Sequence, residues 1–150
     1  MRKKSIIFVC TGNTCRSPMA EIILKTKFKL AGVTDIKVSS AGLCATAGEK
    51  MSKNSSLALK QLGYKPVGFK SKPLTKELIE KATMVVCMTI SHKLQLIEYN
   101  NVYTIAELCG CADISDPYGG SLITYVQTSH QIEDACNIIL NKILETKGEN

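Results

Sequence analysis

The sequence predicts an α/β protein: a single domain with a four-stranded parallel sheet flanked by helices on both faces. Short apolar runs alternate with longer stretches of helical periodicity along the whole chain. The run Met84–Met88 is continuously apolar, as in a parallel strand buried on both faces. No repeat, low-complexity tract or linker divides the 150 residues. We therefore expect one domain over residues 1–150.

Strands and helices are expected to alternate. Four runs rich in β-branched and apolar residues predict strands at residues 5–9, 35–39, 84–88 and 102–105. Helical spacing of apolar residues, with Gly or Thr at several ends, predicts helices at 18–30, 52–62, 75–81, 91–99 and 121–147. Ser40-Ala41-Gly42 is expected to form a tight turn. In such a fold, ligands bind at the carboxyl ends of the strands.

The segment between the first strand and the first helix reads Cys-Thr-Gly-Asn-Thr-Cys-Arg-Ser. A loop in this position concentrates backbone N–H groups around one point, where an oxyanion can bind. Cys10 lies at its start and Arg16 six positions later, so a thiolate nucleophile and a guanidinium fork can share one phosphoryl group. This pattern predicts a cysteine-dependent phosphatase. Its expected phosphate-binding residues are Thr11, Gly12, Asn13, Thr14, Cys15, Arg16 and Ser17.

Chemistry also explains the residue types at three further positions of the loop. Gly12 permits a positive φ and a close approach of the backbone to phosphate. Asn13 can hold the loop through side-chain hydrogen bonds. Ser17 is expected to cap the helix and can donate a hydrogen bond to the departing thiolate. The alternative is a structural strand–turn–helix in which Cys10 only packs, and the combination of residues argues against it.

Catalysis also requires a proton donor for the leaving group. The candidate is Asp116, in the segment Asp116-Pro117-Tyr118-Gly119-Gly120. Pro117 restricts the backbone after the acid, and Tyr118 can form a wall of the pocket. An ordinary turn has the same composition, so this segment alone does not decide its role.

Composition excludes several other classes. The formal net charge is +6, but the lysines are scattered and aromatic residues are only 5 %, which does not favour nucleic acid. The apolar runs are too short to span a membrane. Met1-Arg2-Lys3-Lys4 is not followed by a long apolar stretch, so no signal peptide is predicted and the cytoplasm is expected.

The seven cysteines do not suggest a disulfide framework, because the number is odd. Cys109 and Cys111 have no matching Cys or His pair nearby, so neither a metal nor another cofactor is expected. His92 and His130 are expected to be surface residues.

Three motifs together make the chain resemble the low-molecular-weight protein tyrosine phosphatases. They are the loop Cys10–Ser17, the turn Ser40-Ala41-Gly42 and Asp116-Pro117-Tyr118, and they extend over nearly the whole chain. The resemblance implies an enzyme without a metal that acts on phosphorylated proteins in two steps, and we expect it to be a monomer. Cys10 would form a cysteinyl-phosphate, Arg16 would hold the oxygens, and Asp116 would act first as acid and then as base. It also implies that Ser40 supports the loop.

Departures from the tyrosine-specific pattern concern substrate choice. Thr14 replaces the usual aliphatic residue, Thr89 replaces the Asp after Met88, and Gly119-Gly120 replaces a second aromatic residue. These changes resemble the protein-arginine-phosphatase branch, in which the threonine at the position of Thr14 selects the substrate. Thr14, Thr89 and Tyr118 are therefore the expected specificity residues. The alternative is sequence drift within a tyrosine phosphatase.

Two more distant alternatives remain. An arsenate reductase on this fold would relay oxidation through downstream cysteines, and Cys87 could be the first of them. However, residues 89–96 contain no second cysteine. A non-enzymatic anion-binding module would need neither a thiol nor an acid.

Cys15, in the same loop as Cys10, is the expected redox partner of the nucleophile.

Overall fold

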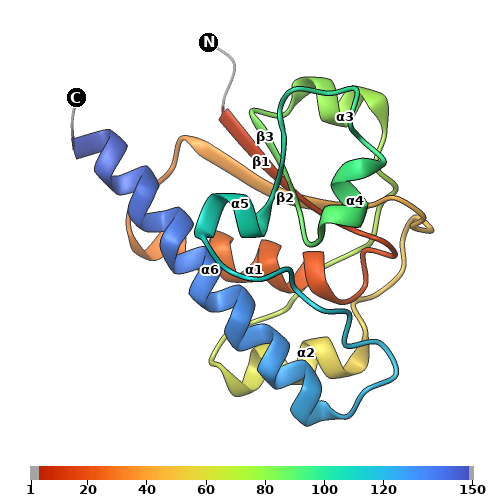
Figure 1. Ribbon diagram of the computed structural model, residues 1–150. Helices are drawn as coiled ribbons and strands as arrows, with labels where there is room; N and C mark the ends of the chain where they lie inside the picture. Colours follow the sequence, from red (N-terminus) through yellow and green to blue (C-terminus); the bar gives the residue numbers. More distant parts are fainter. Residues whose placement is uncertain (1–3, 149–150) are drawn as a thin grey trace.

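The structure is a computed structural model that describes residues 4–148. Figure 1 shows a sheet with helices on both of its faces. The strands are β1 (Lys4–Cys10), β2 (Ile36–Gly42), β3 (Met84–Cys87) and β4 (Val102–Thr104). The helices are α1 (Arg16–Leu30), α2 (Lys53–Gln61), α3 (Lys76–Lys81), α4 (Ile90–Leu94), α5 (Ile105–Cys109) and α6 (Leu122–Gly148).

The sheet is entirely parallel, with the strand order β2-β1-β3-β4. The first strand is therefore an interior strand, and Cys10, its last residue, pairs with Gly42 at the end of β2. This order places the end of β1 between neighbours on both sides. The predicted four-stranded parallel sheet is confirmed, and the loop after β1 emerges at its carboxyl edge.

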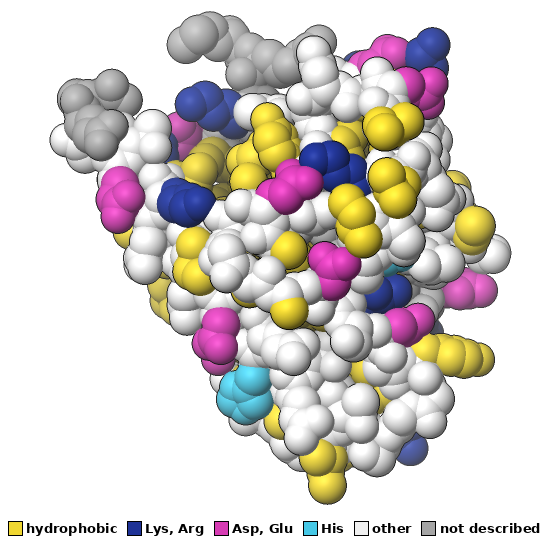
Figure 2. All heavy atoms as spheres, viewed as in Figure 1, with side chains coloured by type: hydrophobic (Ala, Val, Ile, Leu, Met, Phe, Trp, Pro, Cys, Tyr) yellow, Lys and Arg dark blue, Asp and Glu magenta, His cyan; other side chains and the backbone are white. Residues whose placement is uncertain are grey.

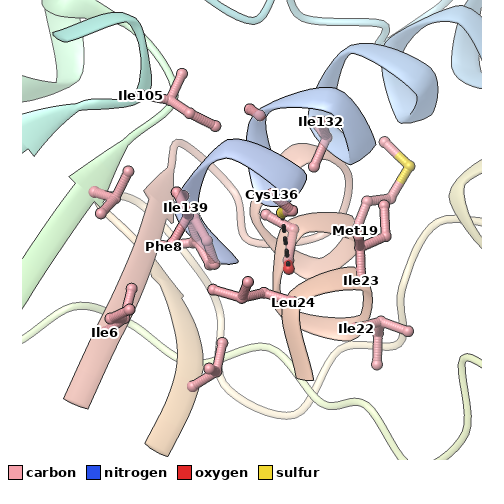
Figure 3. Close-up of a cluster of buried hydrophobic side chains, with 14 of the residues drawn as sticks. Ile6, Phe8, Met19, Ile22, Ile23, Leu24, Ile105, Ile132, Cys136 and Ile139 are labelled. Atoms are coloured by element: carbon pink, nitrogen blue, oxygen red, sulfur yellow. Dashed lines mark hydrogen bonds between the residues drawn. The ribbon is translucent and has the colours of Figure 1, made fainter. Parts of the chain in front are cut away.

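Alternating side chains of β1 enter two cores. Ile6, Phe8 and Cys10 face the core under α1 and α6, whereas Ile7 and Val9 face a second core against α3. Figure 3 shows the first core, where Phe8 lies among side chains of α1 and α6. The labelled residues there are Ile6, Phe8, Met19, Ile22, Ile23, Leu24, Ile105, Ile132, Cys136 and Ile139. Because β1 is covered on both faces, its position is firmly determined by burial.

Several element boundaries differ from expectation. Ser40-Ala41-Gly42 is not a turn but the end of β2, because these residues pair in register with residues 8–10. Helix α1 begins at Arg16, and its N-cap is Cys15 rather than Ser17. Helix α4 ends at Leu94, five residues earlier than predicted, since residues 95–98 form turns. No helix was predicted between the fourth strand and residue 121, but this segment contains α5, which Thr104 starts with a capping box.

The surface shows no single-sign stripe on the face seen in Figure 2, where Lys and Arg side chains are interspersed with Asp and Glu. None of the helices described between residues 4 and 148 combines the length and hydrophobicity needed to span a bilayer. All seven cysteines lie in this part of the chain and all are free thiols. His92 is buried, at 4 % exposure, so its assignment to the surface was wrong.

Candidate active site

The loop 11–15 connects the end of β1 to the start of α1 and forms one side of a pocket of about 240 Å³. The lining residues are Cys10, Thr11, Gly12, Thr14, Cys15, Arg16, Asp116 and Tyr118. The N-terminal turn of α1 has no side-chain cap, so its backbone N–H groups are available at the loop. Residues from two segments 100 positions apart therefore meet around a site suited to an anion.

Asn13 organises the loop from within. Its φ of 56° is left-handed, so Asn13, and not Gly12 as expected, takes the unusual backbone conformation. The side chain is fully buried, and its Nδ2 donates to Ser17 Oγ at 2.9 Å and to Ser40 Oγ at 3.0 Å. Its Oδ1 accepts the backbone N–H of Lys72 at 2.9 Å. These three bonds attach the loop to α1, to β2 and to the segment before α3.

Ser40 continues this network towards α1. Its hydroxyl accepts from Asn13 and donates to Glu21 Oε1 at 2.7 Å. Gly42, two residues later, is required sterically, because a Cβ there would lie 2.6 Å from the carbonyl oxygen of Thr11. The end of β2 thus supports the loop through the Ser40 side chain. The absence of a side chain at Gly42 leaves room for the loop backbone.

The Cys10 thiol has a defined hydrogen-bond partner. Its Sγ lies 2.8 Å from Ser17 Oγ, and both groups are buried. Because Ser17 Oγ accepts the Asn13 amide, the single hydroxyl hydrogen of Ser17 is free to point at the sulfur. Ser17 can therefore stabilise a thiolate at Cys10, in place of the N-cap role expected for it.

Arg16 is oriented by two acceptors. Its Nη1 donates to the carbonyl oxygen of Ile114 at 3.0 Å, and its Nη2 lies 3.6 Å from Asp116 Oδ2. The arginine side chain is 6 % exposed, whereas that of Asp116 is 53 % exposed. The ion pair is thus open to solvent on the side of the acid. The guanidinium remains fixed, while the carboxylate faces the mouth of the pocket.

Tyr118 lies at that mouth, where it lines the pocket although it is 82 % exposed. Its backbone N–H donates to Asp116 Oδ1 at 3.0 Å, which closes a local turn. Gly119 follows with a φ of +79°, and a Cβ at Gly120 would lie 2.9 Å from the carbonyl oxygen of Pro117. The backbone geometry of this turn therefore explains glycine at both positions, in addition to any effect on the substrate.

Cys15 turns towards α2 and α6. It packs in a small buried cluster with Ala58 and Tyr125, and its Sγ lies 3.5 Å from Ser52 Oγ and 3.6 Å from Tyr125 Oη. Burial, followed by the contact with Cys15, raises the pKa of Tyr125 to about 12. Tyr125 is therefore a neutral phenol that can donate to the sulfur of Cys15.

Thr89 does not line the pocket. Its hydroxyl caps α4 and lies 3.0 Å from His92 Nδ1, and the other ring nitrogen of His92 lies 3.0 Å from Thr11 Oγ1. Thr89 thus reaches the pocket only through His92. Thr14, in contrast, lines the pocket directly.

The structure brings together every residue that the sequence placed in the loop, together with Asp116 and Tyr118, and puts Ser40 one layer behind them. Sequence reasoning missed contacts that come from outside the loop. These are His92, Ile114, Ser52, Tyr125, Glu21 and the backbone of Lys72. No local pattern marks them, because each contributes one ordinary polar group.

Other candidate chemistry finds little support. Cys87 is fully buried in β3, and burial raises the pKa of its thiol to about 12, which does not suit a redox relay. Among residues 4–148, no three His, Cys, Asp or Glu side chains gather in a way that could hold a metal ion.

Comparisons with known proteins agree with this geometry. The family model described as low molecular weight phosphotyrosine protein phosphatase matches residues 5–149. The chain is 41 % identical to the protein-arginine-phosphatase of Bacillus subtilis strain 168 over 139 residues, which cover 86 % of this chain and 89 % of that protein. It is 36 % identical to the low molecular weight protein-tyrosine-phosphatase PtpB of Staphylococcus haemolyticus over 135 residues, or 85 % and 91 % of the two chains.

A solved structure of similar shape is the YwlE arginine phosphatase from Geobacillus stearothermophilus. It superposes with a TM-score of 0.89 at 33 % identity and covers 98 % of this chain and 97 % of its own. The family model and the identities together show the relationship over almost the whole sequence. The chain therefore belongs to the low molecular weight phosphotyrosine protein phosphatase family.

Proposed function

We propose that this protein hydrolyses phosphoarginine on proteins, with Cys10 as nucleophile, Arg16 as oxyanion clamp and Asp116 as general acid and base. The observation that carries the substrate choice is the set of residues that line the pocket. They include Thr11, Thr14 and Asp116, whose side chains carry oxygen atoms, and Tyr118 is the only aromatic residue among them. Similarity to protein-arginine-phosphatases supports the same substrate.

In the first step, the Cys10 thiolate attacks phosphorus and the P–N bond to the guanidinium group breaks. The nitrogen leaves with the bonding electrons and takes a proton from the Asp116 carboxyl group. Arg16 and the backbone N–H groups of the loop bind the phosphoryl oxygens as charge develops on them. The products are a protein substrate with an unmodified arginine side chain and a cysteinyl-phosphate on the enzyme.

In the second step, water attacks the phosphorus of the cysteinyl-phosphate and the P–S bond breaks. The Asp116 carboxylate now accepts a proton from the water, which restores its acid form. The sulfur leaves as a thiolate, and the Ser17 hydroxyl at 2.8 Å can donate to it. Inorganic phosphate departs and the enzyme returns to its starting state.

Replacing Thr14 with Ile tests the substrate assignment. The β-branched side chain keeps similar backbone preferences, so the loop should still form. The lost hydroxyl leaves an N–H group of phosphoarginine without a partner, which costs about 1–3 kcal/mol, or roughly ten- to a hundredfold in specificity. We expect kcat/KM to fall by that factor on a phosphoarginine peptide and to hold or rise on a phosphotyrosine peptide.

Thr14→Ser is the matched control, because it keeps the hydroxyl and should retain the wild-type preference. Two results would overturn the arginine assignment: a wild-type enzyme that already prefers phosphotyrosine, or a parallel fall of both activities in Thr14→Ile. The second candidate function, tyrosine phosphatase, would then stand, with the exposed ring of Tyr118 as a stacking surface.

We further propose that peroxide produces a reversible disulfide between Cys10 and Cys15. Oxidation of Cys10 to a sulfenic acid, followed by attack of the Cys15 thiol, forms the S–S bond and releases water. The polar contacts of the Cys15 sulfur with Thr14, Ser52 and Tyr125 are all long, so the bond would cost mainly its packing against Ala58 and Tyr125. Peptide mass mapping after peroxide should detect the bond, and thiol should restore activity. Absence of the bond, or equally full recovery in Cys15→Ser, would contradict this role.

Finally, we propose that residues 1–150 act as a single phosphatase domain, as a monomer in the cytoplasm and without a cofactor. Seven free cysteines fit a reducing compartment. The family match over residues 5–149 fits one domain. Gel filtration with light scattering tests the monomer, and fractionation of the source cells tests the compartment.

A further inference from the structure

His92 is a buried histidine that the proposed mechanism does not use. It lies in the first turn of α4 at 4 % exposure, and both ring nitrogens have hydroxyl partners. Nε2 lies 3.0 Å from Thr11 Oγ1, and Nδ1 lies 3.0 Å from Thr89 Oγ1. The ring therefore connects a pocket-lining residue of the loop, 81 positions earlier in the sequence than His92, to the N-cap of α4.

The Thr89 end of this connection is held in place. The Thr89 hydroxyl also lies 2.9 Å from Ser91 Oγ and accepts the backbone N–H of His92 at 3.4 Å. Burial, and secondarily the charge of Arg16, lower the pKa of His92 to about 4, while Asp116 and Asp113 act in the opposite direction. The imidazole is thus neutral near pH 7, with one N–H donor and one acceptor nitrogen.

Thr11 retains hydrogen-bonding capacity towards the pocket. A hydroxyl has one hydrogen and two lone pairs, and His92 uses only one of these three. Whichever ring nitrogen carries the hydrogen, at least one lone pair of Thr11 Oγ1 remains. Because Thr11 lines the pocket, that lone pair is available to an N–H donor of a bound substrate.

We propose that Thr11 is a second specificity-determining residue, which accepts a hydrogen bond from the guanidinium group of phosphoarginine, and that His92 is the positioning residue that holds its hydroxyl in place. This inference rests on the proposed function and deepens it. A guanidinium group offers several N–H donors, whereas the aryl ring of phosphotyrosine offers none. An aryl ring against Thr11 would dehydrate the hydroxyl without replacing its hydrogen bond.

A double-mutant cycle tests both residues together. Thr11→Val removes the hydroxyl with little change in shape, and His92→Phe keeps a ring but removes both hydrogen bonds. For each enzyme, kcat/KM is measured on a phosphoarginine peptide and on p-nitrophenyl phosphate. We expect each single variant to lower the ratio of the two values about tenfold, and the double variant to lower it no further, because His92 acts through Thr11.

Two matched variants control for structure. Thr11→Ser keeps the hydroxyl and should hold the ratio within about twofold of wild type. Thr83→Val makes the same chemical change just before the start of β3, at the end of the sheet away from the pocket. Thr83 Oγ1 accepts the Ser5 N–H there, and this variant should leave the ratio unaltered. Thermal melts confirm folding, and Thr11→Val alone decides the question about Thr11 should His92→Phe fail to fold.

The inference fails if Thr11→Val lowers both activities equally, if Thr11→Ser loses the ratio as well, or if the two single effects add in the double variant. These results differ from failure of the proposed function itself. A wild-type enzyme that prefers the phosphotyrosine peptide overturns the substrate assignment before any variant is compared. A wild-type preference for phosphoarginine that Thr11→Val leaves intact overturns only the role of Thr11.

Discussion

Replacing Cys10 with Ser is expected to abolish phosphatase turnover while the protein still binds inorganic phosphate. The seryl hydroxyl is a far poorer nucleophile and leaving group than a thiolate. The anion site, however, does not depend on the sulfur, because the hydrogen bonds that hold the loop come from Asn13 and Ser40 and the guanidinium of Arg16 is fixed by Ile114. Rates on p-nitrophenyl phosphate measure turnover, and calorimetric titration with phosphate measures binding.

Cys44→Ser is the matched control for this experiment. Cys44 is an exposed free thiol just after β2, outside the pocket lining, and its replacement should leave the rate near that of wild type. A Cys10→Ser enzyme with a rate within tenfold of wild type would rule out the covalent mechanism. Loss of phosphate binding in the same variant would show that the thiol is needed to form the loop.

Replacing Asp116 with Asn should slow substrates with poor leaving groups far more than activated ones. General acid catalysis typically contributes 10²–10⁴-fold, and an aryl phosphate with a good leaving group does not need the proton. Asn can still accept the Tyr118 N–H, so the local turn should survive. The ion pair with Arg16 is lost, but it is long and half exposed and contributes little. Rates across a series of aryl phosphates of increasing leaving-group pKa measure the effect.

Asp113→Asn provides the comparison for Asp116. Asp113 lies in the same connection and accepts the backbone N–H of Ile90, but it does not line the pocket. Its replacement should leave the dependence on leaving group unchanged. Equal losses on all substrates in Asp116→Asn would instead indicate that Asp116 acts only by orienting Arg16.

The elements were predictable where burial imposes a clear local pattern. The first strand and the central strand at Met84 follow from their continuous apolar runs, and the long C-terminal helix follows from its apolar periodicity. Errors arose where pairing or capping overrides the local signal. Ser40-Ala41-Gly42 has the composition of a turn, yet pairing with β1 extends it as a strand. Helix α5 is too short for its periodicity to be seen in the sequence.

The structure weakens the support for phosphoarginine from two of the substitutions. Gly119 has a positive φ, so its presence follows in part from the turn that positions Asp116 and Tyr118. Thr89 acts one layer away from the pocket, through His92. Thr14 remains the substitution that lies directly in the pocket lining.

The anion loop could be predicted from the sequence, because Cys10 and Arg16 lie in one short segment between a strand and a helix. Local backbone geometry brings such near neighbours together in any fold that forms those two elements. The distant groups that complete the site depend instead on how the chain packs in three dimensions. Asp116, His92 and Ser40 reach the loop through the strand order β2-β1-β3-β4 and the connections after β3 and β4. Their contacts depend on long-range packing of buried surfaces. Such packing produces no repeating pattern in the sequence around a single polar residue.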